Sequence, residues 1–149
     1  LLRRSSSDHH SILTFGQAYA SFMGGHAFDP EKRSTVKFID DPDLAYCMLR
    51  YRQIHDFLHV LCNLPPTVLG ELALKWVELL QNKLPVAALS VLFGPLQLNA
   101  KERHIYDTVY KPWAISTGTK ANFLMNVYFE ELLDQDLEKV REALSITPA

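Results

Sequence analysis

The sequence has 149 residues, of which 48% are hydrophobic and 21% charged, values that are ordinary for a globular protein with one sizeable core. Its formal net charge of −2 gives no reason to expect nucleic-acid binding, which normally leaves a strongly basic footprint. The two cysteines, Cys47 and Cys62, are too few for a disulfide framework and indicate a reducing compartment.

The chain divides into an N-terminal segment, residues 1–35, which we expect to be partial, and one helical domain over residues 36–149. It begins with Leu1 rather than methionine, so we expect a fragment or a processed form, and any targeting peptide lies outside the sequence. Residues 1–8 are basic and rich in serine; a frayed terminus is favoured there over the tail of a presequence. The adjacent pair His9-His10 is expected on the surface.

Two helices are predicted before the first proline pair. Helical spacing runs from Thr14 to Met23 and ends at two glycines. Residues 36–39 are compatible with a brief extended piece. The acidic residues and the proline of residues 40–43 are typical of a helix start. From there we predict one helix over residues 44–64.

A third helix is predicted after Pro65-Pro66-Thr67, since these residues end one helix and open the next. Its apolar face at helical spacing consists of Leu69, Leu72, Trp76, Leu79 and Leu80. Its opposite face carries a narrow polar stripe of Glu71, Lys75 and Glu78.

Residues 84–100 contain no charged residue. This stretch is too short, and too interrupted by proline and glycine, to span a membrane. We therefore predict a core helix by default. The alternatives are that it forms a wall of an apolar cavity or lies on a membrane surface. A kink or new helix start is predicted at residues 111–114 and a break at Gly118. One last helix is predicted over residues 122–145. These elements together predict an all-α, single-domain helical bundle.

The most informative motif is His55-Asp56-x-x-His59 in the second helix. At about 100° per residue, His59 lies about 40° from His55, and Asp56 about 100° from it, so the three side chains share one arc of the helix. A set of two imidazoles and a carboxylate suits zinc or iron and leaves coordination positions free for water or substrate. The alternative is a half-exposed helix whose histidines only pack.

Glu71 follows His59 by twelve residues, on the next helix, where a tight turn can fold it back toward the histidines. Spacing alone does not separate a ligand Glu71 from a surface residue, because Glu71 and Lys75 also have the i, i+4 spacing of an ion pair on a solvated helix. Cys62 lies three residues after His59, and a buried structural cysteine is favoured over a ligand there.

The sequence resembles the coenzyme Q (ubiquinone) biosynthesis protein four family from about residue 36 to residue 146. The residues that carry this resemblance are Arg50-Tyr51-Arg52-Gln53, His55-Asp56-x-x-His59, Gly70-Glu71 with Lys75 and Trp76, Leu84-Pro85, Phe93-Gly94-Pro95-Leu96, Pro112-Trp113-Ala114, Gly118, Asn126-x-Tyr128-x-Glu130 and residues 137–146. Lys83 stands where a glycine is expected before Leu84-Pro85, and the N-terminal portion of a full-length member is missing.

The resemblance implies a zinc-type site on His55, Asp56, His59 and Glu71, with Fe²⁺ as the alternative because zinc does no redox chemistry. It also implies decarboxylation at C1, coupled to hydroxylation, of a 4-hydroxy-3-methoxy-5-polyprenylbenzoate-type intermediate. These four residues are the expected catalytic group, in which Asp56 or Glu71 moves a proton if it is not a ligand. Substrate binding is expected from Arg52 and Lys75, and a surface salt bridge is the alternative for each.

The resemblance further implies a peripheral protein on the matrix face of the mitochondrial inner membrane. Its expected partners are a polyprenylated benzoate or quinone lipid, other coenzyme Q biosynthesis proteins and the membrane surface. A homodimer is a further possibility. The apolar segment 84–98 is the expected groove for the lipid tail.

Two other functions compete with the enzyme. One is a non-catalytic scaffold that binds a polyprenyl lipid and gathers the enzymes of the pathway. The other, unconnected with the family, is a metal-dependent phosphohydrolase. That class needs a further distant histidine and aspartate, for which His104 and Asp107 are the nearby candidates.

Overall fold

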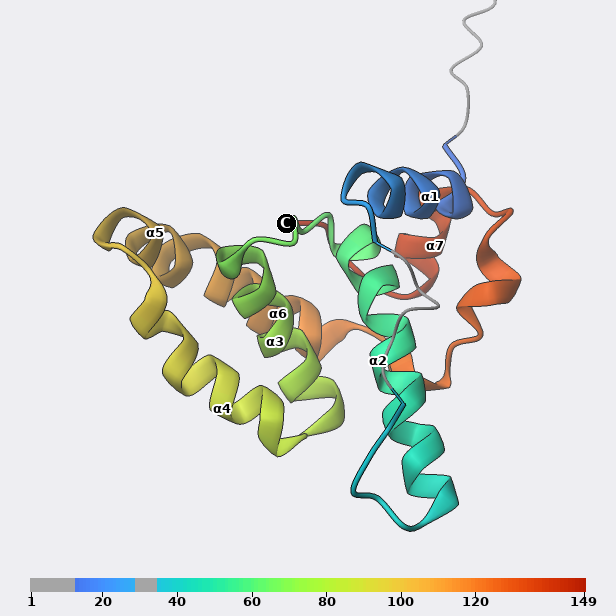
Figure 1. Ribbon diagram of the computed structural model, residues 1–149. Helices are drawn as coiled ribbons and strands as arrows, with labels where there is room; N and C mark the ends of the chain where they lie inside the picture. Colours follow the sequence, from blue (N-terminus) through green and yellow to red (C-terminus); the bar gives the residue numbers. More distant parts are fainter. Residues whose placement is uncertain (1–12, 29–34) are drawn as a thin grey trace, which may run out of the picture.

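The computed structural model describes residues 13–28 and 35–149, which form an all-α fold, as predicted (Figure 1). Within these ranges the β structure is one isolated bridge between Thr14 and Asp136, and the extended piece expected at residues 36–39 is not a strand. The expectations for residues 1–8, His9 and His10 lie outside the described residues. No helix in these two ranges combines the length and hydropathy that crossing a membrane requires.

Helix α1 (Phe15–Gly25) begins at a capping box. The Thr14 side chain accepts from the backbone N–H of Gln17, and the Gln17 side chain accepts from the backbone N–H of Thr14. The backbone N–H groups of Phe15 and Gly16 donate to carbonyls of the C-terminal region. The start of α1 is therefore tied to residues far away in the sequence.

Helix α2 (Pro42–Cys62) carries the histidine motif and confirms the predicted helix, with its start two residues earlier. Asp41 caps it by accepting from the N–H groups of Asp43 and Leu44, and Pro42 stands in the first turn, where a missing N–H costs nothing. The helix ends at Asn63, whose backbone is left-handed with φ of 55°.

Helix α3 (Val68–Asn82) starts after the proline pair, with Thr67 accepting from the N–H of Gly70. Gly70 is required by the turn, because a Cβ atom at this position would overlap the carbonyl oxygen of Pro65. The turn is therefore tight enough to bring the first turn of α3 back to the end of α2.

The apolar segment from residue 84 forms helix α4 (Pro85–Phe93) and the 3₁₀ turn η2 (Gly94–Gln97). The prediction of a core helix is wrong here. Within α4 only Ala87 is buried, whereas five large apolar side chains of this segment are more than half exposed: Val86, Leu89, Leu92, Phe93 and Leu96. Helix α4 packs on α3, and the residue that it buries is the small Ala87. The apolar composition of the segment does not reveal that its larger side chains stay exposed.

Three consecutive helical elements follow: α5 (Ala100–Ile105), the π-helical turn η3 (Tyr106–Tyr110) and α6 (Lys111–Lys120). The chain stays helical through Pro112, which stands in the first turn of α6. Just before it, the N–H of Lys111 bonds to the carbonyl of Tyr106, five residues earlier, which is the spacing of a π-helical turn. The predicted break at Gly118 is wrong. Gly118 lies inside α6, where a Cβ atom would lie 3.1 Å from Cα of Val77, so the glycine permits close packing of α6 on α3.

The single helix predicted over residues 122–145 is also wrong. The chain instead forms the 3₁₀ turns η4 (Leu124–Asn126) and η5 (Phe129–Leu132) and the short helix α7 (Leu137–Ala143). The carbonyls of Leu133 and Gln135 accept from the N–H groups at the start of α1, each at 2.8 Å, so the segment between η5 and α7 is bonded to α1 and does not continue as a helix.

The helices lie in two groups (Figure 1). In one, α2 packs on α1, which also contacts α7; in the other, α3 packs on both α4 and α6. The two groups meet where α2 turns into α3. The core lies along this junction and includes Ile54, Leu58, Leu61, Ala73, Leu74 and Val77.

Candidate metal centre

Two imidazoles of α2 face each other at the junction with α3. His55 and His59 are one turn apart, their ring planes are nearly perpendicular at 85°, and their Nε2 atoms lie 3.3 Å apart. The side chain of His59 is 2% exposed and that of His55 19%. Phe22 of α1 stacks on the His59 ring and closes one side.

The other nitrogen of each ring, Nδ1, is hydrogen-bonded to an oxygen atom that can act only as a hydrogen-bond acceptor. Nδ1 of His59 lies 3.1 Å from the backbone carbonyl of Leu64, and Nδ1 of His55 lies 2.7 Å from Oε1 of Glu78. Both Nδ1 atoms therefore donate an N–H, which directs the lone pairs of both neutral rings through Nε2 toward each other.

The carboxylate of Glu71 completes the group. Its oxygens lie 3.3 Å from Nε2 of His55 and 3.1 Å from Nε2 of His59. Burial favours the neutral acid, but the hydrogen bonds and charges of the two histidines outweigh it and hold the pKa of Glu71 well below its usual range. Glu71 is therefore a carboxylate, as a metal ligand must be.

Three electron-rich atoms thus converge on one point and require positive charge between them. Without a metal a proton supplies it: burial disfavours the imidazolium of His55, yet hydrogen bonds to Glu71 and Glu78 raise its pKa to about 9. These side chains also fit a divalent cation, since one ligand atom from each of His55, His59 and Glu71 lies within 4.8 Å of the others. Tetrahedral ligands at bond lengths of about 2.0–2.1 Å lie roughly 3.3 Å apart.

Glu78 is the residue that sequence reasoning missed. The sequence pattern assigns it to a solvated polar stripe, but its side chain is 1% exposed and accepts three hydrogen bonds: from Tyr51 at 2.6 Å, from Lys75 at 2.5 Å and from His55. These partners outweigh the effect of burial and lower the pKa of Glu78. The signal available in the sequence is its spacing of seven residues from Glu71, which puts both on one face of α3.

Lys75 lies beside this group, but not in the ion pair that its spacing from Glu71 suggested. Its ammonium donates to Glu78 and to the hydroxyl of Tyr51 at 3.1 Å, and lies over the Tyr51 ring. Glu71 is paired with the two histidines instead. Lys75 therefore sits next to the candidate centre with its charge held in place.

The structure does not bring all the sequence-predicted residues into this group. Asp56 is buried on α2 but is not one of the three residues whose ligand atoms converge, and Arg52 is partly exposed on the same helix. Cys62 is fully buried, as expected, and burial raises its pKa to about 12.

The phosphohydrolase hypothesis gains nothing from the structure. His104 and Asp107 are exposed, and Asp107 is paired with Arg103 at 2.9 Å. Neither residue belongs to the converging group found in the described ranges.

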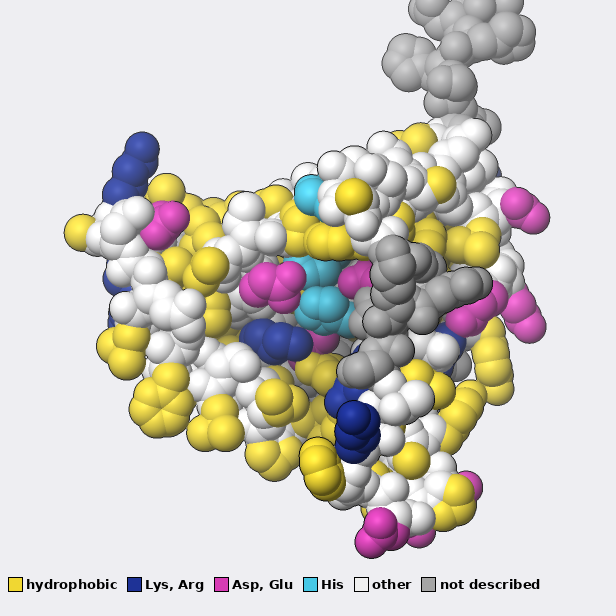
Figure 2. Space-filling view, viewed as in Figure 1, with side chains coloured by type: hydrophobic (Ala, Val, Ile, Leu, Met, Phe, Trp, Pro, Cys, Tyr) yellow, Lys and Arg dark blue, Asp and Glu magenta, His cyan; other side chains and the backbone are white. Residues whose placement is uncertain are grey.

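The centre opens to the surface between α3 and the neighbouring helices. Figure 2 shows histidine side chains at the centre of one face, in a hollow beside acidic and basic side chains. A cavity of about 610 Å³ between α3 and α4 is lined by Glu71 and Lys75 together with apolar residues of α4 that include Leu89 and Phe93. The candidate ligand Glu71 is thus part of the lining of a cavity whose other side is apolar.

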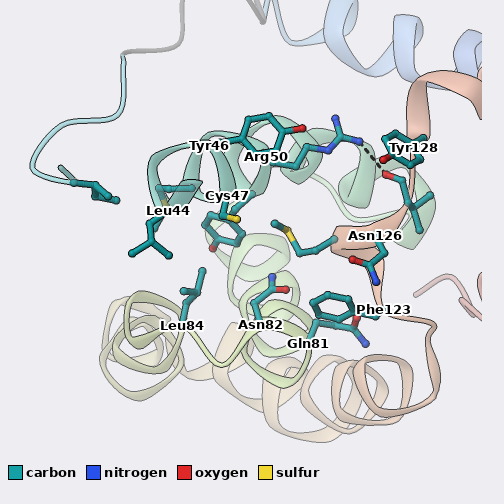
Figure 3. A pocket seen from close by; sticks show the side chains of 15 residues that line it. Leu44, Tyr46, Cys47, Arg50, Gln81, Asn82, Leu84, Phe123, Asn126 and Tyr128 are labelled. Carbon is teal, nitrogen blue, oxygen red and sulfur yellow. Dashed lines mark hydrogen bonds between the residues drawn. The ribbon is translucent and has the colours of Figure 1, made fainter. Parts of the chain in front are cut away.

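A larger cavity of about 780 Å³ lies near the N-terminal half of α2 (Figure 3). Figure 3 shows Tyr46 and Arg50 of α2 facing Leu84 and Phe123 across it. Tyr51, which donates to Glu78, also lines this cavity. Tyr51 therefore joins this cavity to the hydrogen bonds around Glu78, whereas His55 and His59 are not among its lining residues.

The sequence profile of the family described as "Coenzyme Q (ubiquinone) biosynthesis protein Coq4" matches residues 6–149. The chain belongs to this family. The resemblance found from the motifs is thus confirmed. Among relatives of the Coq4 family, the "Ubiquinone biosynthesis protein coq4, mitochondrial" of Schizosaccharomyces pombe is 46% identical over 136 residues, which cover 91% of this chain and 50% of the relative.

A second Coq4 relative is the "Ubiquinone biosynthesis protein COQ4 homolog, mitochondrial" of Nematostella vectensis, which is 45% identical over 139 residues, covering 91% of this chain and 67% of the relative. The chain spans about half to two thirds of the length of these curated relatives. The crystal structure of a putative ubiquinone biosynthesis protein from Nostoc punctiforme has the same fold, with a TM-score of 0.75 at 23% identity, covering 89% of this chain and 62% of that one.

Proposed function

We propose that this protein acts in ubiquinone biosynthesis as a metal-dependent carbon–carbon lyase. The proposed substrate is a 4-hydroxy-3-methoxy-5-polyprenylbenzoate-type intermediate. Its C1 carboxylate leaves as carbon dioxide and a hydroxyl group takes its place at that carbon, an oxidation for which dioxygen is the proposed external oxidant. Membership of the Coq4 family supports the pathway. The proposal of a metal ion rests on the convergence of His55, His59 and Glu71 on one point.

The ligands of this centre are His55, His59 and Glu71, with Asp56 as a fourth residue that ligates or moves a proton. Zn²⁺ is the proposed ion and Fe²⁺ the alternative, because replacing a carboxylate by a hydroxyl group is an oxidation. A bound divalent cation supplies Lewis acidity toward a carboxylate and stabilises negative charge that develops on the ring.

The cavity between α3 and α4 is proposed to receive the substrate. It joins the candidate ligand Glu71 and the cation Lys75 to the apolar side chains of α4. An aromatic acid with a prenyl tail matches this lining, because it has a negative charge at one end and an apolar surface along the rest of the molecule. Lys75 is proposed to attract the anion, and Arg52 to help orient it.

A non-catalytic scaffold is the second candidate function, and the exposed apolar surface of α4 and η2 favours it. Leu92 and Leu96 are 67% and 77% exposed, and a surface of this kind suits a lipid or a protein partner. In this alternative the protein binds a polyprenyl lipid and organises other coenzyme Q biosynthesis proteins. For both functions we propose a peripheral location on the matrix side of the mitochondrial inner membrane, and a homodimer is compatible with either.

The deciding experiment measures metal content and turnover of a short-tailed substrate analogue by the purified protein. Enzyme function predicts that zinc- or iron-loaded protein releases carbon dioxide from the analogue, and that a folded His59→Ala variant does not. The scaffold hypothesis predicts no turnover with either metal. It also predicts that variants in which the metal-ligand residues are substituted still support assembly of the biosynthetic proteins. A His59→Ala variant with the full wild-type rate contradicts the proposed metal mechanism.

A further inference from the structure

The geometry points to Glu78 as a positioning residue that orients His55 toward a bound metal ion. This inference rests on the metal centre proposed above and extends it to a residue that does not itself ligate. The carboxylate of Glu78 lies behind the His55 ring, on the side away from His59, and reaches Nδ1 at 2.7 Å.

Glu78 is an unusual residue to bury for stability alone. Its side chain is 1% exposed, and removing a carboxylate from water is costly even when it is paired. A buried charged cluster is often no more stable than apolar residues of similar volume. Of its three hydrogen-bond donors, Tyr51, Lys75 and His55, only His55 belongs to the candidate centre, so the contact with His55 is the one through which Glu78 can act on a bound metal ion.

The hydrogen bond from His55 decides which ring nitrogen faces the centre. When Nδ1–H donates to Glu78, the lone pair of the neutral ring lies on Nε2, which points to Nε2 of His59 and to Glu71. A carboxylate behind a ligating imidazole also makes that ligand more basic and restricts rotation of the ring.

His59 provides an internal comparison, because it has the same arrangement with a different acceptor. Its Nδ1 donates to the backbone carbonyl of Leu64, so its orientation is built into the turn that ends α2. Nδ1 of His55 instead donates to the side chain of Glu78. Of the two supports, only Glu78 can be removed by substituting a side chain.

Glu78 is itself held in place by two further donors. Tyr51 donates at 2.6 Å and Lys75 at 2.5 Å, so the carboxylate cannot turn away from His55 without losing both. Glu71 and Glu78 lie two turns apart on one face of α3. One helix therefore supplies an acid on each side of the His55 ring.

The test compares Zn²⁺ affinity, measured by competition with a chromophoric chelator, in wild-type protein and three glutamate-to-glutamine variants. Glu78→Gln is expected to weaken Zn²⁺ binding by about tenfold to a hundredfold, the usual effect of losing such a support. Glu71→Gln removes a proposed ligand and is expected to weaken it at least as much. Glu131→Gln, an exposed glutamate in η5, is the matched control and is expected to bind as the wild type does.

A second readout separates positioning from a purely structural role. Visible absorption of the Co²⁺-loaded proteins reports the ligand geometry, and thermal unfolding of the metal-free proteins reports the fold. Positioning predicts that folded Glu78→Gln has both a weaker affinity and an altered Co²⁺ spectrum. A structural role predicts only a lower unfolding temperature. Should Glu78→Gln fail to fold, Glu78→Asp keeps the charge, shortens the reach to His55 and is expected to show the same two changes.

The outcomes distinguish this inference from the proposed function. Wild-type protein that binds Zn²⁺, a Glu71→Gln variant that loses it and a Glu78 variant with wild-type affinity and spectrum would overturn the role of Glu78 alone. Wild-type protein that binds neither Zn²⁺ nor Co²⁺ overturns the metal centre and this inference together.

Discussion

The carboxylate of Glu71 lies 3.1 Å from Nε2 of His59, although the two residues belong to different helices. Their contact depends on the turn between α2 and α3. There the left-handed Asn63 ends α2, and Thr67 caps α3 through the N–H of Gly70. The candidate centre is thus built across a helix–helix turn, and its geometry is sensitive to changes in that turn.

Gly70→Ala is expected to disturb both the fold and the centre. The added Cβ atom would overlap the carbonyl oxygen of Pro65, so the start of α3 must shift, at a cost of about 1–3 kcal/mol in the free energy of unfolding. Because Glu71 is the next residue, Zn²⁺ affinity should fall as well. Urea unfolding and chelator competition measure the two effects.

Gly24→Ala is the control for that substitution. Gly24 lies near the end of α1, and a Cβ atom there meets nothing within 4 Å. Alanine loses less conformational entropy than glycine on entering a helix, so the variant should be unchanged or more stable by about 0.5–1 kcal/mol. Equal destabilisation by the two alanines would contradict the packing described for Gly70.

The stability of the metal-free protein should fall as the pH rises from about 6.5 to about 9. The native pKa of His55 is about 9, above its ordinary value of 6.5, because Glu71 and Glu78 stabilise its charged form. A raised pKa means that the native state binds the proton more tightly than the unfolded state. Its stabilising effect is therefore complete below pH 6.5 and lost as the pH rises through about 9.

Urea unfolding of metal-free wild type and of His55→Gln across this pH range tests the prediction. The loss expected for the wild type is on the order of 2 kcal/mol, and the variant should lack most of it. Other groups that titrate in this range are present in both proteins. Parallel stability curves would show that His55 is not the group responsible.

Tyr106→Phe should destabilise the protein by about 1–3 kcal/mol, because it leaves a polar partner without its hydrogen bond. The buried hydroxyl of Tyr106 accepts from the indole N–H of Trp76 at 2.6 Å and so joins the π-helical turn to α3. Tyr128→Phe removes a hydroxyl from a side chain that is 71% exposed and should change stability little. Chemical denaturation of both variants makes the comparison, and a neutral Tyr106→Phe would disprove the role of this bond.

Two leucine-to-alanine substitutions test whether α4 is exposed rather than part of the core. Leu74 of α3 is fully buried, so Leu74→Ala should cost about 2–5 kcal/mol through lost burial and a residual cavity. Leu92 of α4 is 67% exposed, so Leu92→Ala should stay within about 0.5 kcal/mol of the wild type. If Leu92→Ala is as costly as Leu74→Ala, α4 is a core helix in solution after all.

The local sequence was enough to predict the first three helices, because their boundaries depend on nearby residues. Thr14, Asp41 and Thr67 cap helices through hydrogen bonds to residues two or three positions away, and prolines and glycines mark the ends. It was likewise enough to bring His55, His59 and Glu71 together as candidates, since the first two are one turn apart and the third follows a tight turn.

Only the tertiary structure decided the remaining features. The C-terminal region has the pattern of one helix, but its carbonyls at Leu133 and Gln135 bond to α1 from over a hundred residues away in the sequence. Glu78 and Lys75 have the pattern of a solvated stripe, yet Glu78 accepts from Tyr51 and His55 of α2, and Lys75 donates to Tyr51. Helical periodicity shows which side chains share a face, but which face is buried depends on the neighbouring helix that packs against it.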